Sequence, residues 1–127
     1  MNRKSNHGWL GRLVAGITML MTLMAMGVHA QTVNIVGIGA ASCAHFNEEI
    51  ARNPRAERDY LAWAQGFMSG ALLRAPKGVD EDLDLLPPAF PLDKQAAFLR
   101  AFCAERATQD YSDAVHALYQ RLKGAPT

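Results

Sequence analysis

The sequence has few of the residues that enzymes and metal sites use, and they form no complete motif. Its 127 residues include two cysteines and four histidines, and only His45 and His116 lie beyond residue 30. A structural zinc site needs four ligands, whereas Cys43-Ala44-His45 has no second pair to complete it. Ser69 stands one position too late for the nucleophile of a G-x-S-x-G motif. The sequence therefore predicts no catalytic residue, no bound metal and no enzymatic activity.

A glycine-rich nucleotide loop is missing as well. Gly37 and Gly39 match the first two glycines of a dinucleotide-binding fingerprint, but the third glycine would fall at position 42, which is Ser42. No strand–helix–strand pattern follows it either. We therefore expect no nucleotide and no other cofactor.

The chain also lacks the basic excess that nucleic-acid binding requires. Thirteen basic residues stand against twelve acidic ones, and three of the basic residues, Arg3, Lys4 and Arg12, belong to the N-terminal segment. The rest of the chain has a net charge of about −2 and no basic patch. Because phosphate contacts supply much of the affinity for nucleic acids, we expect no nucleic-acid partner.

Residues 1–30 have the pattern of a signal peptide. A basic start precedes an apolar run from Leu13 to Val28, and Val28-His29-Ala30 puts small residues where signal peptidase reads them. An uncleaved anchor is the alternative, but the run is short for a membrane span, which needs roughly 20 apolar residues. We predict cleavage after Ala30, a periplasmic protein without stable membrane insertion, and a single helical domain over residues 31–127.

The two cysteines, Cys43 and Cys103, both follow the signal segment. An exported chain meets an oxidising compartment, so we expect a disulfide between them. The bond would close a loop of about 60 residues and contribute roughly 4 kcal/mol through chain entropy. The alternative is a nucleophilic thiol at Cys103, assisted by His116 and Asp113, which nothing nearby in the sequence supports.

The centre of the core is predicted to lie in a helix over residues 55–75. Tyr60, Trp63 and Phe67 recur at steps of three and four, which places them on one helical face. A second stripe, at steps of four, consists of small residues: Ala62, Gly66 and Gly70. Two glycines inside a helix cost roughly 1 kcal/mol each relative to alanine. We therefore expect the third or fourth helix to cover this stripe closely, a second copy of the chain being the alternative occupant.

Caps and apolar periodicity indicate three further helices. Ser42 would cap a helix over residues 43–52, Asp93 one that runs to about residue 107, and Asp110 or Ser112 one that ends at Gly124. Residues 31–39 have no partner strand and are expected to form an extended arm. The prediction is an all-α protein, a small bundle of about four helices with an extended N-terminal arm and one disulfide. The core outside the central helix would contain Phe46, Leu99, Phe102, Leu118 and Leu122.

A loop over residues 77–91 is predicted between the second and third helices. Its acidic run, Asp80-Glu81-Asp82-Leu83-Asp84, matches the start of an EF-hand, but leucine and proline stand where that loop requires glycine and glutamate. We therefore predict a solvated acidic loop without calcium. Leu85, Leu86 and Phe90 are expected to pack it against the core.

Taken together, the motifs resemble a group of small exported proteins. They are Ser42-Cys43-x-x-Phe46, Tyr60-x-x-Trp63-x-x-Gly66-Phe67-x-x-Gly70, Phe102-Cys103 and Ala114-x-x-x-Leu118-Tyr119-x-x-Leu122. The combination is similar to the disulfide-bonded, all-helical periplasmic immunity proteins that neutralise cell-wall amidases delivered by type VI secretion. The second resemblance is to the Hde-type acid-stress chaperones, which are smaller and lack the motif around Trp63.

Each resemblance implies a different function. An immunity-like protein is not an enzyme and binds an effector in the periplasm, here through residues 77–91 and the nearby helix ends, so that the active site of the effector is occluded. A chaperone of the Hde type binds client proteins after acidification. Neither resemblance determines the oligomeric state.

Overall fold

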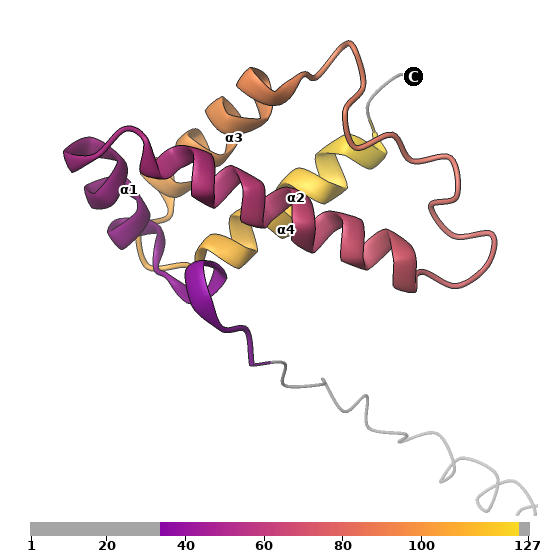
Figure 1. The fold of residues 1–127 in the computed structure, drawn as a ribbon, viewed down its shortest axis with the longest axis horizontal. Helices are drawn as coiled ribbons and strands as arrows, with labels where there is room; N and C mark the ends of the chain where they lie inside the picture. The colour runs from indigo at the N-terminus through magenta and orange to yellow at the C-terminus, as the bar shows by residue number, and fades with distance from the viewer. Residues whose placement is uncertain (1–33, 125–127) are drawn as a thin grey trace, which may run out of the picture. The chain divides into compact units, whose positions relative to one another are not determined.

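The computed structural model describes residues 34–124, and within them the protein is all-helical. A short 3-10 turn, η1 (Gly37–Ala40), precedes four helices: α1 (Cys43–Arg52), α2 (Ala56–Arg74), α3 (Leu92–Glu105) and α4 (Tyr111–Lys123) (Figure 1). This arrangement confirms the predicted small helical bundle. The predicted signal peptide over residues 1–30 and its cleavage site after Ala30 lie outside the described residues.

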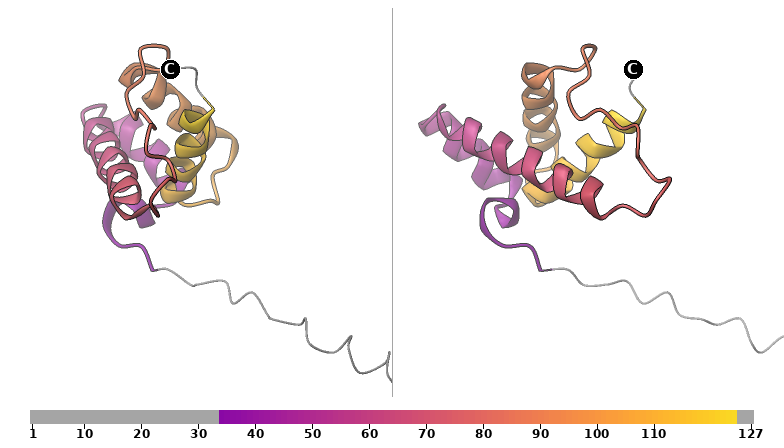
Figure 2. Two further views of the ribbon diagram at one scale, coloured as in Figure 1. Left: turned by 90° about the vertical axis from the view of Figure 1, so that its right-hand side faces the viewer. Right: turned by 45° about the vertical axis from the view of Figure 1, so that its right-hand side comes forward.

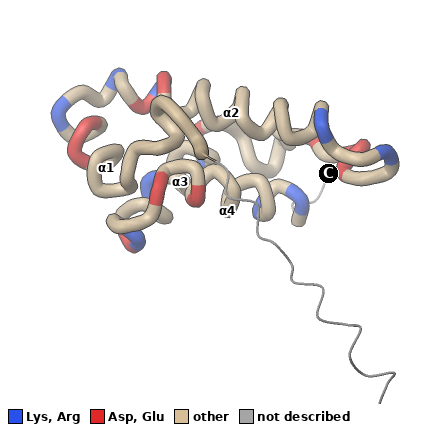
Figure 3. The backbone as a smooth tube through the Cα atoms, turned by 90° about the horizontal axis from the view of Figure 1, so that it is seen from below, with Lys and Arg blue, Asp and Glu red and all other residues tan. Residues whose placement is uncertain are grey.

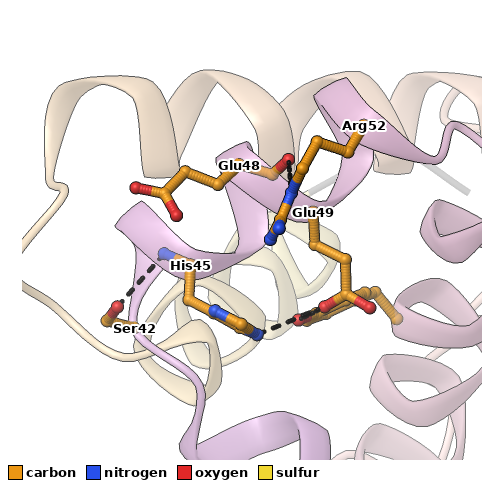
Figure 4. A network of polar contacts seen from close by, with 6 residues as sticks. Ser42, His45, Glu48, Glu49 and Arg52 are labelled. Carbon is orange, nitrogen blue, oxygen red and sulfur yellow. Dashed lines mark hydrogen bonds and ion pairs between the residues drawn. The ribbon is translucent and has the colours of Figure 1, made fainter.

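Local signals set the helix boundaries. The Ser42 hydroxyl accepts a hydrogen bond from the His45 amide at 3.2 Å (Figure 4), which confirms the predicted cap of α1. Asp110 and Asp113 form a reciprocal capping box at the start of α4. Asp93 was expected to cap α3 and does not, because that helix already begins at the preceding residue. Asp93 instead lies in the first turn, where its charge suits the helix dipole.

The predicted disulfide joins Cys43, the first residue of α1, to Cys103 in the last turn of α3, with an S–S distance of 2.04 Å. Both cysteines are fully buried. Backbone hydrogen bonds hold the same end of α1, since the Cys43 amide donates to the Gln109 carbonyl at 2.7 Å and the Ala44 amide to the Ala107 carbonyl at 2.9 Å. The start of α1 is therefore attached both to α3 and to the α3–α4 connection.

Three aromatic rings form the centre of the core. Phe46 of α1, Tyr60 of α2 and Tyr111 of α4 have ring centroids 4.8 to 4.9 Å apart, which is the range of favourable edge-to-face contacts. The Tyr60 hydroxyl donates to the Glu49 carboxylate at 2.7 Å, so its polar end has a partner. Around these rings the predicted core residues Leu99, Leu118 and Leu122 are buried, whereas Phe102 is only partly buried.

The buried face of α2 differs from the predicted one. The residues that face the core recur at steps of four: Ala56, Tyr60, Ala64 and Met68. Trp63 is only partly buried, and Phe67, which is 38% exposed, stacks on it with ring centroids 5.2 Å apart. Phe67 was predicted as a central core residue and is instead exposed, whereas Trp63 packs against the edge of the core, with its ring centroid 6.2 Å from that of Tyr111. Both residues lie about a quarter turn away from the stripe that meets α4.

The small residues of α2 were expected to pack under another helix, and this expectation is also wrong. Ala62 and Gly66 are exposed, and a Cβ atom built on Gly66 or Gly70 would meet no atom within 4 Å. The stripe lies on the side of α2 that faces away from the core.

Among the described residues, no helix is long and apolar enough to cross a membrane.

The N-terminal arm ends in a structured turn. Residues 34–36 have no regular secondary structure, and η1 then packs against α2 and α4. Gly39 is buried, and a Cβ atom at this position would overlap the Trp63 ring. η1 thus covers part of Trp63, whose ring also lies against Tyr111 of α4, with ring centroids 6.2 Å apart. Residues 31–33 of the predicted arm lie outside the described residues.

Candidate functional site: the acidic loop between α2 and α3

Residues 77–91, here called the acidic loop, pass the C-terminal end of α4 on their way from α2 to α3 (Figure 2). Asp80 joins the loop to α4 through polar contacts. Asp80 accepts a hydrogen bond from the Tyr119 hydroxyl at 2.8 Å, and its other carboxylate oxygen lies 2.9 Å from the Lys123 ammonium. Tyr119 and Lys123 are one helical turn apart on α4, so both reach the same carboxylate.

This arrangement favours the ionised form of Asp80. Lys123, followed by the hydroxyl of Tyr119, lowers the pKa of the Asp80 carboxyl below its ordinary value. Burial and the hydrogen bond to Asp80 raise the pKa of Tyr119 to about 12, so its hydroxyl stays a donor at neutral pH. Asp80 also has a positive φ of 58°, which aspartate tolerates better than most residues. The loop was predicted to be solvated, and the contacts of Asp80 show that part of it is held in place against α4.

A second attachment lies at the other end of the loop. Gln95 of α3 is fully buried, and its side-chain amide donates to the carbonyls of Leu85 at 2.9 Å and Phe90 at 3.1 Å. The side chains of Leu85 and Phe90 pack against the core, which confirms that part of the prediction. Leu86 is 51% exposed and does not, because its amide turns toward the Asp84 carboxylate at 2.7 Å.

The loop encloses a cavity against the end of α4. Its volume is about 340 Å³, and its lining consists of Gly78, Asp80, Glu81, Asp82, Leu83, Asp84, Pro87, Leu122 and Lys123. The lining has four carboxylates and a single ammonium group, and that ammonium is already paired with Asp80. Figure 3 shows the acidic residues of this segment close to the basic residues at the end of α2. The cavity is therefore a negatively charged hollow with an apolar side.

Exposed apolar side chains surround this part of the molecule. Val79 is 44% exposed, Leu86 51% and Leu92, the first residue of α3, 37%. These three belong to the few large apolar residues that the described chain leaves in water. A loop that is held at both ends and presents apolar groups beside carboxylates has the composition of a protein-binding surface.

The residues considered for chemistry are not assembled into a reactive site. The Cys103 sulfur is bonded to Cys43, so it is not a nucleophile in this state, and His116 is exposed on α4. His45 lies 3.4 Å from Glu49 on the same helix (Figure 4). Ser69 is exposed on α2. Within residues 34–124, no three histidine, cysteine, aspartate or glutamate side chains are grouped as metal ligands are.

Sequence reasoning missed the residues that hold the loop. Tyr119 and Lys123 are spaced for one helical face, but their partner, Asp80, lies 39 residues before Tyr119 in the chain. Gln95 lies among apolar residues of a predicted helix. A polar amide at such a position was the only sequence feature that could have indicated a buried hydrogen bond to the loop. Compared with protein-family models, with curated proteins and with solved structures, the chain matches none.

Proposed function

We propose that this protein is an exported, non-enzymatic binding protein of the immunity-like type, which binds a protein partner in the periplasm through the acidic loop. The observation that carries the proposal is the exposure of Val79, Leu86 and Leu92 around a loop held by Asp80 and Gln95. A loop that is already ordered loses little conformational entropy on binding, so more of its contact energy becomes affinity.

The disulfide supports the exported location and argues against a nucleophilic thiol at Cys103. Disulfides persist in oxidising compartments such as the periplasm, and Cys43 and Cys103 are bonded to each other. With both sulfurs occupied, no free cysteine is left within the described residues. The small, disulfide-bonded, all-helical fold also agrees with the architecture that the resemblance to immunity proteins implies.

The charge of the loop indicates how the partner would be oriented. Glu81, Asp82 and Asp84 line the cavity together with apolar Leu83 and Pro87. A partner whose surface has basic residues around an apolar centre would complement this distribution. Binding of the loop over the active site of an enzyme would block that site sterically, without any catalytic residue in this chain.

Crosslinking in the periplasm tests this proposal. The wild-type chain should recover one stoichiometric partner, and the double variant Val79→Asp, Leu86→Asp should lose it. Val36→Asp is the matched control, since Val36 is an equally apolar, 79% exposed residue far from the loop in sequence. If no partner is recovered, and no secreted effector encoded nearby becomes toxic when the protein is deleted, the proposal fails.

An acid-stress chaperone of the Hde type is the second candidate, and the Asp80 contact favours it. The lowered pKa of Asp80 means that its ionised form stabilises the folded loop at neutral pH and that this stabilisation is lost as the pH falls through the folded-state pKa. Release of the loop would uncover Leu122 of α4 and expose Leu83 of the loop itself. An unchanged aggregation of client proteins at low pH in the presence of the chain would exclude this candidate.

A further inference from the structure

The outer side of α2 consists of small residues together with the exposed Leu73 and Ser69, and no other part of the described chain covers it. Leu73 is 86% exposed there, beside the small residues Ala62, Gly66 and Gly70, and the stacked rings of Trp63 and Phe67 border it. In Figure 1 this helix lies across α4, and Figure 2 shows one side of α2 facing away from the bundle. The face is separate from the acidic loop.

The two glycines on this face have no explanation within the chain. Neither Gly66 nor Gly70 has a positive φ, and both have open space where a Cβ atom would be. Each costs roughly 1 kcal/mol relative to alanine in an exposed helix. Gly39, by contrast, is required by its contact with Trp63. Close approach of another backbone is the physical use of glycine at i and i+4 on an open helix face.

We propose that this face binds the same face of a second copy, with the two α2 helices antiparallel and crossing near Gly66. Like faces meet in a two-fold dimer, so the apolar residues of one copy cover those of the other. Charge selects the orientation. Asp59 precedes the crossing point by two turns and Arg74 follows it by two turns, and neither makes an ion pair within the described residues.

The antiparallel arrangement brings these two charges together. Successive helical residues are separated by about 100° around the axis, so Arg74 is displaced toward the side of Trp63 and Arg58 toward the opposite side. In an antiparallel two-fold dimer, a residue that lies to one side of the line of contact in one copy lies to the same side in the other copy. Arg74 of one copy therefore approaches Asp59 of the other and stays away from Arg58. Parallel helices would instead set Asp59 against Asp59 at the same height.

The aromatic residues give the same orientation. In the antiparallel pair both Trp63–Phe67 stacks lie along one rim of the interface. Phe67 follows Gly66 by one residue and is therefore turned about 100° from the contact line, so its exposed part, 38% in the single chain, borders that of its symmetry mate at this rim. In the parallel pair the stacks would lie on opposite sides and remain in water.

Analytical ultracentrifugation of the oxidised chain tests the dimer. We expect a concentration-dependent dimer whose dissociation constant rises by about tenfold or more in Gly66→Gln, since a side chain there separates the backbones. The same variant should raise the melting temperature of the dilute, monomeric protein, because glutamine favours helix over glycine. Ala101→Gln, at an exposed small residue of α3, is the matched control and should change neither property.

A charge exchange tests the orientation. Asp59→Arg should weaken the dimer, and addition of Arg74→Asp should restore it, because the exchanged pair is again complementary. A wild-type chain that stays monomeric at submillimolar concentration overturns the proposal, and so does a dimer that Gly66→Gln leaves intact. A double variant that dimerises no better than Asp59→Arg alone overturns the antiparallel register.

Discussion

The Tyr119 hydroxyl donates a hydrogen bond to the Asp80 carboxylate at 2.8 Å, and this contact connects the acidic loop to α4 across 39 residues of sequence. Lys123 completes it from the next helical turn at 2.9 Å. The side chain of Asp80 is 14% exposed, so water competes little for its oxygens. This end of the loop is therefore held by three polar groups, and the Tyr119 hydroxyl can be removed while its ring keeps its packing against the core.

Tyr119→Phe should loosen the loop and leave the helices intact. The variant keeps the ring, which is partly buried, and removes only the donor to Asp80. Hydrogen exchange of residues 78–84 should become several-fold faster, while exchange in α1 and α3 stays unchanged, since local openings need not involve the whole fold. Gln120→Ala, at an exposed neighbour on α4, should have no effect. Equal exchange in Tyr119→Phe and the wild type would contradict the role of the hydroxyl.

The attachment of the loop should depend on pH. Because the folded-state pKa of Asp80 lies below its ordinary value of 3.8, the ionised carboxylate stabilises the loop above that pH. As the pH falls through the folded-state pKa, this stabilisation is lost, and the loop should open in preference to the core. Hydrogen exchange at several acidic pH values measures the transition. Asp80→Asn should remove the pH dependence and give an open loop at every pH. If loop opening still depends on pH in this variant, another carboxylate is responsible.

Removal of the disulfide should cost about 4 kcal/mol of unfolding free energy, because the bond closes a loop of 60 residues in the unfolded chain. Replacement of Cys43 and Cys103 together by alanine tests this value, with urea unfolding as the measurement. Reduction of the wild type should give the same loss. An unfolding curve that neither treatment shifts would mean that the backbone contacts of α1 suffice by themselves.

Two Gly→Ala substitutions should have opposite effects on stability. Gly39→Ala places a methyl group against the Trp63 ring and should destabilise the protein by about 1–3 kcal/mol through overpacking. Gly66→Ala enters open space in an exposed helix and should stabilise the dilute chain by up to about 1 kcal/mol. Thermal unfolding of both variants at one low concentration provides the comparison. Shifts of the same sign would contradict the packing described for one of the two sites.

Gln95→Leu should destabilise the protein by about 2 kcal/mol, although it makes a buried position more apolar. The amide of Gln95 donates to two loop carbonyls, and its loss leaves both without that partner. Gln120→Leu, on the exposed side of α4, provides the control and should change the unfolding free energy little. A neutral Gln95→Leu variant would show that the loop is held by its apolar side chains alone.

Features with a local cause could be predicted from the sequence. Ser42 and Asp110 begin α1 and α4 because their side chains accept hydrogen bonds from the first helical turn. The disulfide followed from the expected compartment and the presence of two cysteines. The apolar residues of α4 recur at helical spacing, so Leu118 and Leu122 were predictable as core residues.

Features that depend on tertiary contacts could not be predicted in the same way. In α2 the aromatic stripe through Trp63 and the stripe through Ala64 and Met68 are equally periodic, and only the position of α4 decides which is buried. Aromatic size favoured the stripe that lies at the edge of the core, where η1 covers part of Trp63. The Asp80–Tyr119 contact has no local signal, since its partners lie in different elements.

The disulfide also has a consequence for cleavage by proteases. The acidic loop lies between the two cysteines in the chain, so a single cut within it yields one fragment with α1 and α2 and another with α3 and α4, still linked by a covalent bond. A nicked molecule would migrate as one species on a gel without reductant and as two with it. The acidic loop can therefore be cut while the two halves remain a single molecule.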